Sequence, residues 1–370
     1  MRIHYLDNAS TTAVCAEAVS ASVHMMTEVY GNPSSVHKMG IEAENAVTTA
    51  RFSVSKALGC ASGEVLFTSG GTESDNMAII RGAELRQRFG RHIITSETEH
   101  AAVLNAAKFL AERGFDVTYL KPTANGGISL DELESAIRPD TILVSLMLTN
   151  NETGAENPVA EASRLFKAKN PKGIFHTDAV QAFMKKKIQV SKLGVDLLSV
   201  SAHKIHGPKG AGALYVKGGL LLKPLIVGGG QERGFRSGTE ATPAIVGFGA
   251  AVEAALAHIE EHAEKVEALR QRLLSGLKTI DSVTVTASGG TIVTFSAPRY
   301  PAEVLIRLLE SRNIFVSGGS ACNRGGESHV LKAMGLDSKL IKSSVRTSLS
   351  HTNDGTDVDA LISALREILK

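Results

Sequence analysis

Lys204 is the residue whose surroundings most clearly suggest chemistry in this sequence. It follows the apolar residues 196–200 and ends the segment Ser201-Ala202-His203-Lys204. A lysine at the end of a buried strand, beside hydroxyl and imidazole groups, is poorly explained as a surface charge. The same setting suits a lysine that loses its proton and forms a Schiff base with an aldehyde cofactor. This interpretation predicts an acid for a ring nitrogen, a phosphate cradle and a stacking ring.

Asp178 and His100 are candidates for the acid and the ring. Asp178 follows the strand-like residues 173–175, where an aspartate either caps a helix or holds a protonated pyridine nitrogen. His100 precedes a helical pattern, and its imidazole could stack on a planar cofactor and exchange protons near neutral pH. The alternative for His100 is a solvent-facing histidine in a loop.

Two glycine-rich segments could bind anions. In Gly70-Gly71-Thr72, glycines at a turn from strand to helix let backbone N–H groups face a phosphate, although a tight turn with a threonine cap fits equally. Residues 228–239 form a basic, glycine-rich loop, which is either an anion-binding surface or a surface loop.

Cys322 and Arg346 complete the set of candidates. Cys322 lies in a polar, glycine-rich segment near Arg324, a setting that suits an exposed thiol with thiolate character. Arg346 lies in an alternating, strand-like pattern, so it either faces solvent or reaches into a cleft to hold a carboxylate.

The elements that position these residues alternate between short apolar strands and helical patterns. We expect strands near 64–68, 92–95, 115–120, 141–148, 173–177, 196–200 and 212–216. Such alternation predicts an α/β fold, a mostly parallel sheet with helices on both faces. Ligands bind at the carboxyl ends of strands in such sheets, where the candidates lie. From residue 250 a long helix to 277 and then antiparallel strands and helices predict a smaller α+β lobe. We divide the chain into a large domain, 15–250, and a small domain, 1–14 with 251–370.

Composition limits the functional class. The 370 residues include 40 basic and 38 acidic side chains, a net charge of +2, so we expect no direct partner among nucleic acids. We expect no membrane partner either, since no run of about 18 apolar residues occurs. Three scattered cysteines favour reduced thiols in a cytoplasmic protein. We interpret the three lysines at 185–187 as a solvated edge.

Nine sequence blocks in register resemble one family over nearly the whole chain. The family is the class V aminotransferase group of pyridoxal phosphate enzymes, and within it the cysteine desulfurases of the NifS/IscS type. The blocks occupy residues 5–12, 31–35, 68–76, 99–100, 150–154, 178–181, 201–204, 236–239 and 319–322. The resemblance implies fold type I of the pyridoxal phosphate-dependent transferases, with a seven-stranded sheet in the large domain.

The resemblance also implies the residues that hold the cofactor. Lys204 would carry pyridoxal phosphate and move protons at the substrate carbon, His100 would stack on the ring, and Asp178 would hold its nitrogen. The remaining implied cofactor contacts are Gly71, Thr72, Asn151, Gln181 at the ring hydroxyl, Ser201, His203 and Thr239. Thr239 resembles a phosphate ligand that a neighbouring subunit provides, so a homodimer is implied.

The substrate roles follow from the same resemblance. Asn32, Asn151 and Arg346 resemble the groups that hold the carboxylate of L-cysteine, and Cys322 resembles the nucleophile that becomes a persulfide. A sulfur-acceptor protein is implied, either an iron–sulfur scaffold or a tRNA-thiolation protein. The segment after Cys322 departs from the scaffold-type pattern, which leaves the acceptor open. The alternatives are a class V transaminase, a selenocysteine lyase, and a non-catalytic binding module.

Overall fold

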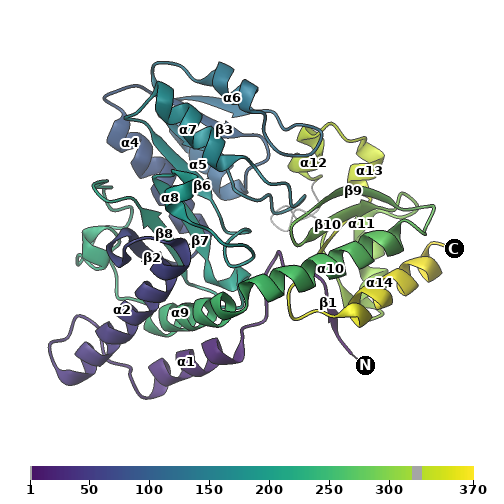
Figure 1. Ribbon diagram of the computed structural model, residues 1–370, viewed down its shortest axis with the longest axis horizontal. Coiled ribbons are helices and arrows are strands. Elements are labelled where there is room, and N and C mark those ends of the chain that lie inside the picture. The colour runs from purple at the N-terminus through teal and green to yellow at the C-terminus, as the bar shows by residue number, and fades with distance from the viewer. Residues whose placement is uncertain (1, 319–326) are drawn as a thin grey trace.

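A seven-stranded sheet forms the centre of the larger of two lobes. The computed structural model describes residues 2–318 and 327–370 (Figure 1). The strand order is β2-β8-β7-β6-β5-β3-β4, and every neighbouring pair is parallel except the two that involve β8. The strands are β2 (Val65–Thr68), β3 (His92–Ser96), β4 (Asp116–Leu120), β5 (Thr141–Ser145), β6 (Ile174–Asp178), β7 (Leu197–Ser201) and β8 (Gly212–Val216). The predicted sheet is therefore confirmed, with one antiparallel strand inserted.

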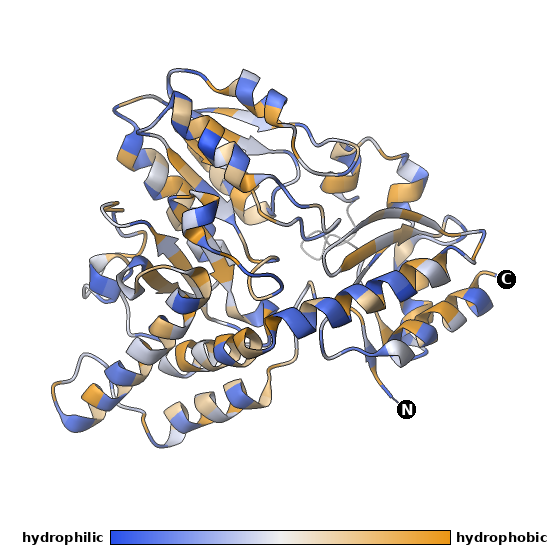
Figure 2. Ribbon diagram, in the orientation of Figure 1, coloured by the Kyte–Doolittle hydropathy of each residue, from blue (hydrophilic) through white to orange (hydrophobic). Residues whose placement is uncertain are grey.

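Helices cover both faces of this sheet because alternate strand residues point to opposite sides. Val65 and Phe67 join one buried apolar cluster, whereas Leu66 between them joins another. Figure 2 shows hydrophobic residues concentrated in the interior strands and hydrophilic residues on outer helices. The helices of this lobe are α1 (Ala16–Thr27), α2 (Lys38–Leu58), α3 (Gly71–Asn76), α4 (Gly82–Arg86), α5 (Ala101–Ala111), α6 (Leu130–Ala136), α7 (Val159–Lys169), α8 (Val190–Leu193) and α9 (Thr242–Ala257), and the π-helix η2 (Met77–Arg81) connects α3 to α4.

The smaller lobe is built around a three-stranded antiparallel sheet of order β12-β10-β9. Its helices pack on this sheet, and its buried side chains include Leu6 together with residues from Val266 to Leu369. This clustering supports the proposed domain division, which stays a prediction. The elements are α10 (Ile259–Leu277), β9 (Thr284–Gly289), β10 (Ile292–Ser296), α11 (Ala302–Glu310), β11 (Ile314–Phe315), α12 (His329–Ala333), α13 (Ser338–Lys342), β12 (Ser344–Ser348) and α14 (Gly355–Ile368).

The single long helix expected over 250–277 is wrong. Two helices, α9 and α10, meet at a 75° bend, and His258 between them has the non-helical dihedrals φ −127° and ψ 17°. The apolar face of α9 packs on α1 and α2 in the large lobe, whereas α10 packs on α14 in the small one. Tertiary packing therefore overrides a local sequence that favours a continuous helix. In the described part of the chain, no lone helix is long and apolar enough to cross a membrane, and only the bent pair α9–α10 passes that test jointly.

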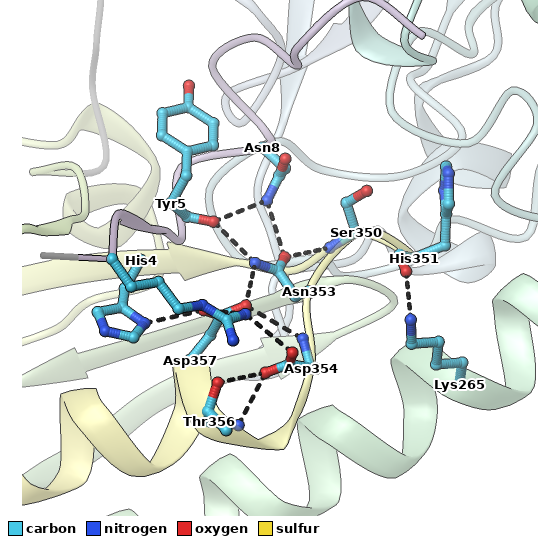
Figure 3. Close-up of polar contacts among 11 residues, drawn as sticks. His4, Tyr5, Asn8, Lys265, Ser350, His351, Asn353, Asp354, Thr356 and Asp357 are labelled. Atoms are coloured by element: carbon cyan, nitrogen blue, oxygen red, sulfur yellow. Dashed lines mark hydrogen bonds and ion pairs between the residues drawn. The ribbon is translucent and has the colours of Figure 1, made fainter. Parts of the chain in front are cut away.

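The N-terminal segment is held by the small lobe. Strand β1 (His4–Tyr5) pairs in parallel with β11, and the side chain of Asn8 then donates to the backbone oxygen of Ser348 at 3.0 Å. Buried Asn353 accepts from Asn8 at 3.1 Å and donates to the Tyr5 oxygen at 2.9 Å, as Figure 3 shows. These bonds fix the path of residues 5–10 as they cross from the small lobe to the large one.

Candidate active site

A cavity of about 490 Å³ lies where strands β6 and β7 end at their carboxyl edge. Residues 9–10 of the N-terminal segment, the turn at 71–72 and β12 of the small lobe also line it. Every predicted site residue in the described ranges 2–318 and 327–370 lines this cavity, apart from Asn32 and Thr239. The arrangement follows from the parallel strands, whose carboxyl ends meet at one edge of the sheet.

Lys204 is held by the N-terminal segment. It ends a short 3₁₀ turn, residues 202–204, that follows β7 directly. Its Nζ atom donates to the backbone oxygens of Ala9 and Ser10, both at 2.7 Å. These bonds hold the amine at the cavity, where its charge also acts on Asp178 and His100.

Asp178 and His100 face the same cavity. The Asp178 carboxylate is 6% exposed and accepts from the backbone N–H of Val180 at 2.9 Å. Burial raises the pKa of Asp178, and the charges of His100 and Lys204 oppose that rise. His100 caps helix α5, since its Nδ1 accepts from the N–H of Ala102 at 3.1 Å. Burial lowers the pKa of His100, which favours a neutral ring with its proton on Nε2.

The turn between β2 and α3 and the end of β7 form an anion cradle. The buried Ser201 hydroxyl has no hydrogen-bond partner among the described residues. A Cβ atom on Gly71 would lie 2.8 Å from Val180 Cγ2, so any other residue would have to displace Val180. Thr72 is exposed at the cavity wall, and burial lowers the pKa of His203 to about 4, which makes it a neutral donor at pH 7. A buried hydroxyl without a partner is costly, so this site is suited to an anion that accepts from it.

Arg346 reaches the cavity from β12 of the small lobe. Its guanidinium group is 2% exposed, which resolves the two alternatives in favour of the buried one. It donates to Asp7 Oδ1 at 2.9 Å, to Ser10 Oγ at 2.6 Å and to the Asn151 backbone oxygen at 2.7 Å. These bonds place the guanidinium at the cavity, where a bound carboxylate would compete with Asp7 for it.

Two predicted residues in the described ranges are not brought into the cavity. Asn32 is exposed, and its side chain accepts from the backbone of Ser34 at 2.9 Å. Thr239 is also exposed, on the glycine-rich loop. Cys322 lies outside the described residues, so its predicted role stays a prediction.

The glycine-rich basic loop is not a free anion-binding surface in this chain. Arg236 donates to the carboxylate of Glu73 at 2.9 Å, next to Thr72. Arg233 donates to the backbone oxygen of Val65 at 2.8 Å. The loop therefore braces the turn that carries the anion cradle.

Sequence reasoning missed two buried carboxyl groups beside Asp178. Asp75 lines the cavity at 1% exposure, and burial together with the Asp178 charge raises its pKa well above the usual range. Glu99 is fully buried, and burial raises its pKa to about 8. The sequence shows only that Asp75 follows the glycine turn and that Glu99 precedes His100. The burial of these carboxyl groups cannot be predicted from a polar segment.

The prediction that residues 185–187 form a solvated edge is wrong for Lys185. Lys185 Nζ lies 2.6 Å from Gln181 Oε1, and burial lowers the pKa of Lys185 to about 7. Lys187 does behave as expected, since it is exposed and pairs with Glu260 at 2.5 Å. The loop after β6 turns Lys185 inward, which a run of identical charges does not reveal.

Comparisons with known proteins agree with this fold and show the family of the chain. The family model described as aminotransferase class-V matches residues 4–361. The cysteine desulfurase IscS of Methanosarcina thermophila is 45% identical over 374 residues, covering 99% of this chain and 92% of that relative. The cysteine desulfurase of Trichormus azollae is 43% identical over 379 residues, covering 100% of this chain and 94% of the relative.

Solved structures extend the similarity to the fold. A NifS-like protein superposes with a TM-score of 0.94 at 40% identity, covering 100% of this chain and 99% of the other. A structure described as SspA in complex with cysteine gives a TM-score of 0.82 at 38% identity, covering 93% and 98%.

The sheet, the lobes and the cavity define a fold type I enzyme that depends on pyridoxal phosphate. The chain belongs to the class V aminotransferase family, and within it to the cysteine desulfurases. The described residues fit the cofactor. Ser201 offers a partnerless buried hydroxyl to a phosphate, Asp178 a carboxylate to a ring nitrogen, and Lys204 an amine to an aldehyde.

Proposed function

We propose that this chain converts L-cysteine to L-alanine and passes the sulfur to Cys322 as a persulfide. The observation that carries the proposal is the meeting of Lys204, Asp178, His100 and Arg346 around one cavity. An amine, a carboxylate, an imidazole and a guanidinium group together match what chemistry at the α-carbon of an amino acid requires.

Pyridoxal phosphate, when bound, supplies an aldehyde for the amino group of the substrate and a ring that withdraws electrons from its α-carbon. Asp178 would hold the ring nitrogen through a charge-assisted hydrogen bond, and Ser201, Thr72 and His203 would bind the phosphate with the Gly71 backbone. His100, held by its own bond to the Ala102 N–H, would contact the ring. These residues would fix the position of the cofactor in the cavity.

Lys204 moves the α-proton of the substrate. Its amine is held at 2.7 Å from two backbone oxygens, which fixes its position at the cavity. A neutral amine accepts the α-proton and can return it to a neighbouring carbon. Arg346 and Asn151 hold the substrate carboxylate, which places the α-carbon beside this amine.

Cys322 takes the sulfur. Its thiolate attacks the sulfur atom of the substrate, an S–S bond forms, and the C–S bond breaks. The electron pair of the broken bond passes to the β-carbon, which gains a proton and becomes the methyl group of alanine. Beyond the segment with Cys322, Ser328 donates to the Glu152 carboxylate, and His329 lies 3.0 Å from the Glu99 oxygen. These contacts anchor the described end of that segment at the cavity.

We also propose a homodimer and a sulfur-acceptor protein. Thr239 does not line its own cavity, which supports the idea that it serves the cavity of a second subunit. Helices α1 and α2, which both pack on α9, expose large apolar side chains, and so does the loop at 221–227. Exposed apolar side chains that gather on one surface are typical of contacts with another protein, which supports the proposed dimer. These side chains are Val19, Val23, Met26, Ile41, Phe52, Leu221, Ile226 and Val227, and Tyr30 between the two helices is exposed as well.

The test measures alanine released from L-cysteine in the presence of a thiol reductant, with Cys322→Ala alongside. We expect alanine from the native protein and little from the variant. Equal alanine from both proteins would refute the persulfide role. A native protein loaded with pyridoxal phosphate that forms no alanine would refute the desulfurase activity. A rate with L-selenocysteine that far exceeds the rate with L-cysteine would favour a selenocysteine lyase.

A further inference from the structure

Lys185 lies behind the wall of the active-site cavity, where no role has been assigned to it. A second cavity, of about 310 Å³, lies between the two lobes and is lined in part by Lys185. Gln181 and Lys204 line both this cavity and the active-site cavity. These two side chains therefore lie in the wall between the two cavities. Lys185 contacts this wall from the side of the second cavity.

A chain of hydrogen bonds joins Lys185 to the catalytic lysine. Lys185 Nζ donates to Gln181 Oε1 at 2.6 Å, and Gln181 Nε2 donates to the Ala9 oxygen at 2.9 Å. The same Ala9 oxygen accepts from Lys204 Nζ at 2.7 Å. Gln181 is 6% exposed, so the loss of either bond would leave a buried amide atom without a partner.

The two partners of Gln181 in this series of hydrogen bonds allow only one orientation of its amide group. An ammonium group can only donate, and a backbone carbonyl can only accept. The amide oxygen must therefore face Lys185 and the amide nitrogen must face Ala9, because a flipped amide would oppose donor to donor and acceptor to acceptor. One N–H group of the nitrogen is used by Ala9, and the second is left for a group bound in the active-site cavity.

We propose that Lys185 is a positioning residue, which locks the Gln181 amide so that it presents an N–H group to the ring hydroxyl of the cofactor. This inference rests on the proposed role of Gln181. Burial, together with the charges of Lys204 and Arg346, lowers the pKa of Lys185 to about 7. An amine keeps N–H groups to donate in either charge state, and the Ala9 carbonyl can only accept, so the orientation of the Gln181 amide is the same on both sides of pH 7.

The experiment measures the dissociation constant of pyridoxal phosphate for the apoprotein by absorbance titration. The variants are Lys185→Met, Gln181→Leu and the double variant, and Lys187→Met is the matched control on the same lysine run. We expect Lys185→Met to weaken binding by about tenfold. We expect the double variant to bind no more weakly than Gln181→Leu, since Lys185 acts only through that amide. Lys185→Arg should restore binding, because the second cavity has room for a longer donor.

Two results would overturn the inference. One is a Lys185→Met protein that binds the cofactor as tightly as Lys187→Met does. The other is a loss from Lys185→Met that persists in the Gln181→Leu background, which would indicate a direct electrostatic effect. A native apoprotein with no affinity for pyridoxal phosphate would instead contradict the proposed function, and circular dichroism separates each case from misfolding.

Discussion

Replacement of Ser201 by alanine should change stability and cofactor binding in opposite directions. The Ser201 hydroxyl is 1% exposed and has no hydrogen-bond partner among the described residues. A buried hydroxyl without a partner costs about 1 kcal/mol or more, and its removal breaks no bond in the apoprotein. We therefore expect the apoprotein of Ser201→Ala to be as stable as the native one, or about 1 kcal/mol more stable.

The same hydroxyl should contribute strongly once a phosphate is bound. A hydrogen bond to a charged group contributes about 2 kcal/mol, so Ser201→Ala should weaken pyridoxal phosphate binding by about thirtyfold. Urea denaturation of the apoprotein gives the first quantity, with the midpoints compared at equal slopes. Absorbance titration with the cofactor gives the second.

Ser199, two residues earlier on β7, provides the matched control. Its hydroxyl lies 3.0 Å from His176 Nε2, and both residues are fully buried. Ser199→Ala should destabilise the apoprotein by about 1 kcal/mol or more. Its hydroxyl also bonds to Asp75 at the cavity, so cofactor affinity should fall, but far less than in Ser201→Ala. If Ser201→Ala destabilises the apoprotein as Ser199→Ala does and binds the cofactor normally, the assignment of this hydroxyl to a phosphate is wrong.

Two further changes test the supports of the site. Asn353→Ala removes the side-chain bonds to Asn8, Tyr5, Ser350 and Asp357. The free energy of unfolding, measured by urea denaturation, should therefore fall by about 3 kcal/mol. A fall below about 1 kcal/mol would contradict the idea that these bonds hold the N-terminal segment. Burial raises the pKa of Glu99 from 4.5 to about 8, so the folded protein keeps a proton there that the unfolded chain releases. Stability should therefore fall as pH rises through this window, and the advantage of Glu99→Gln over the native protein should grow by about 1.4 kcal/mol per pH unit. An advantage that stays constant between pH 5 and pH 8 would show that Glu99 is ionised at neutral pH.

The residues at strand ends were predictable because their positions follow from two regularities. Alternation of strands and helices predicts a parallel sheet, and the sheet brings the ends of β6 and β7 together. The same two regularities place Asp178 and Lys204 at that edge. The sequence leaves two alternatives for Arg346, because a strand pattern does not say which face is covered by the other lobe.

The contacts that complete the site depend on tertiary packing and were not predictable. Lys185 belongs to a run of lysines that is typical of a surface, and only the turn after β6 directs it inward. The Ala9 oxygen, which accepts from two side chains of the site, has no sequence signature at all. Likewise, no proline or glycine marks the bend at His258 in the sequence. The packing of α9 and α10 on different lobes imposes this bend.

The anchoring of the N-terminal segment has a consequence for the order in which the protein folds. Strand β1 pairs with β11, and Asn8 bonds to Ser348 and Asn353, which lie 340 and 345 residues later in the chain. Until these distant pairs form, the Ala9 and Ser10 oxygens lack the support of the small lobe, and both oxygens are acceptors for Lys204. Contacts between residues so distant in sequence form slowly, so we expect the large lobe to fold before the active centre is complete. A chain truncated before β12 should therefore bind pyridoxal phosphate poorly even if its large lobe folds.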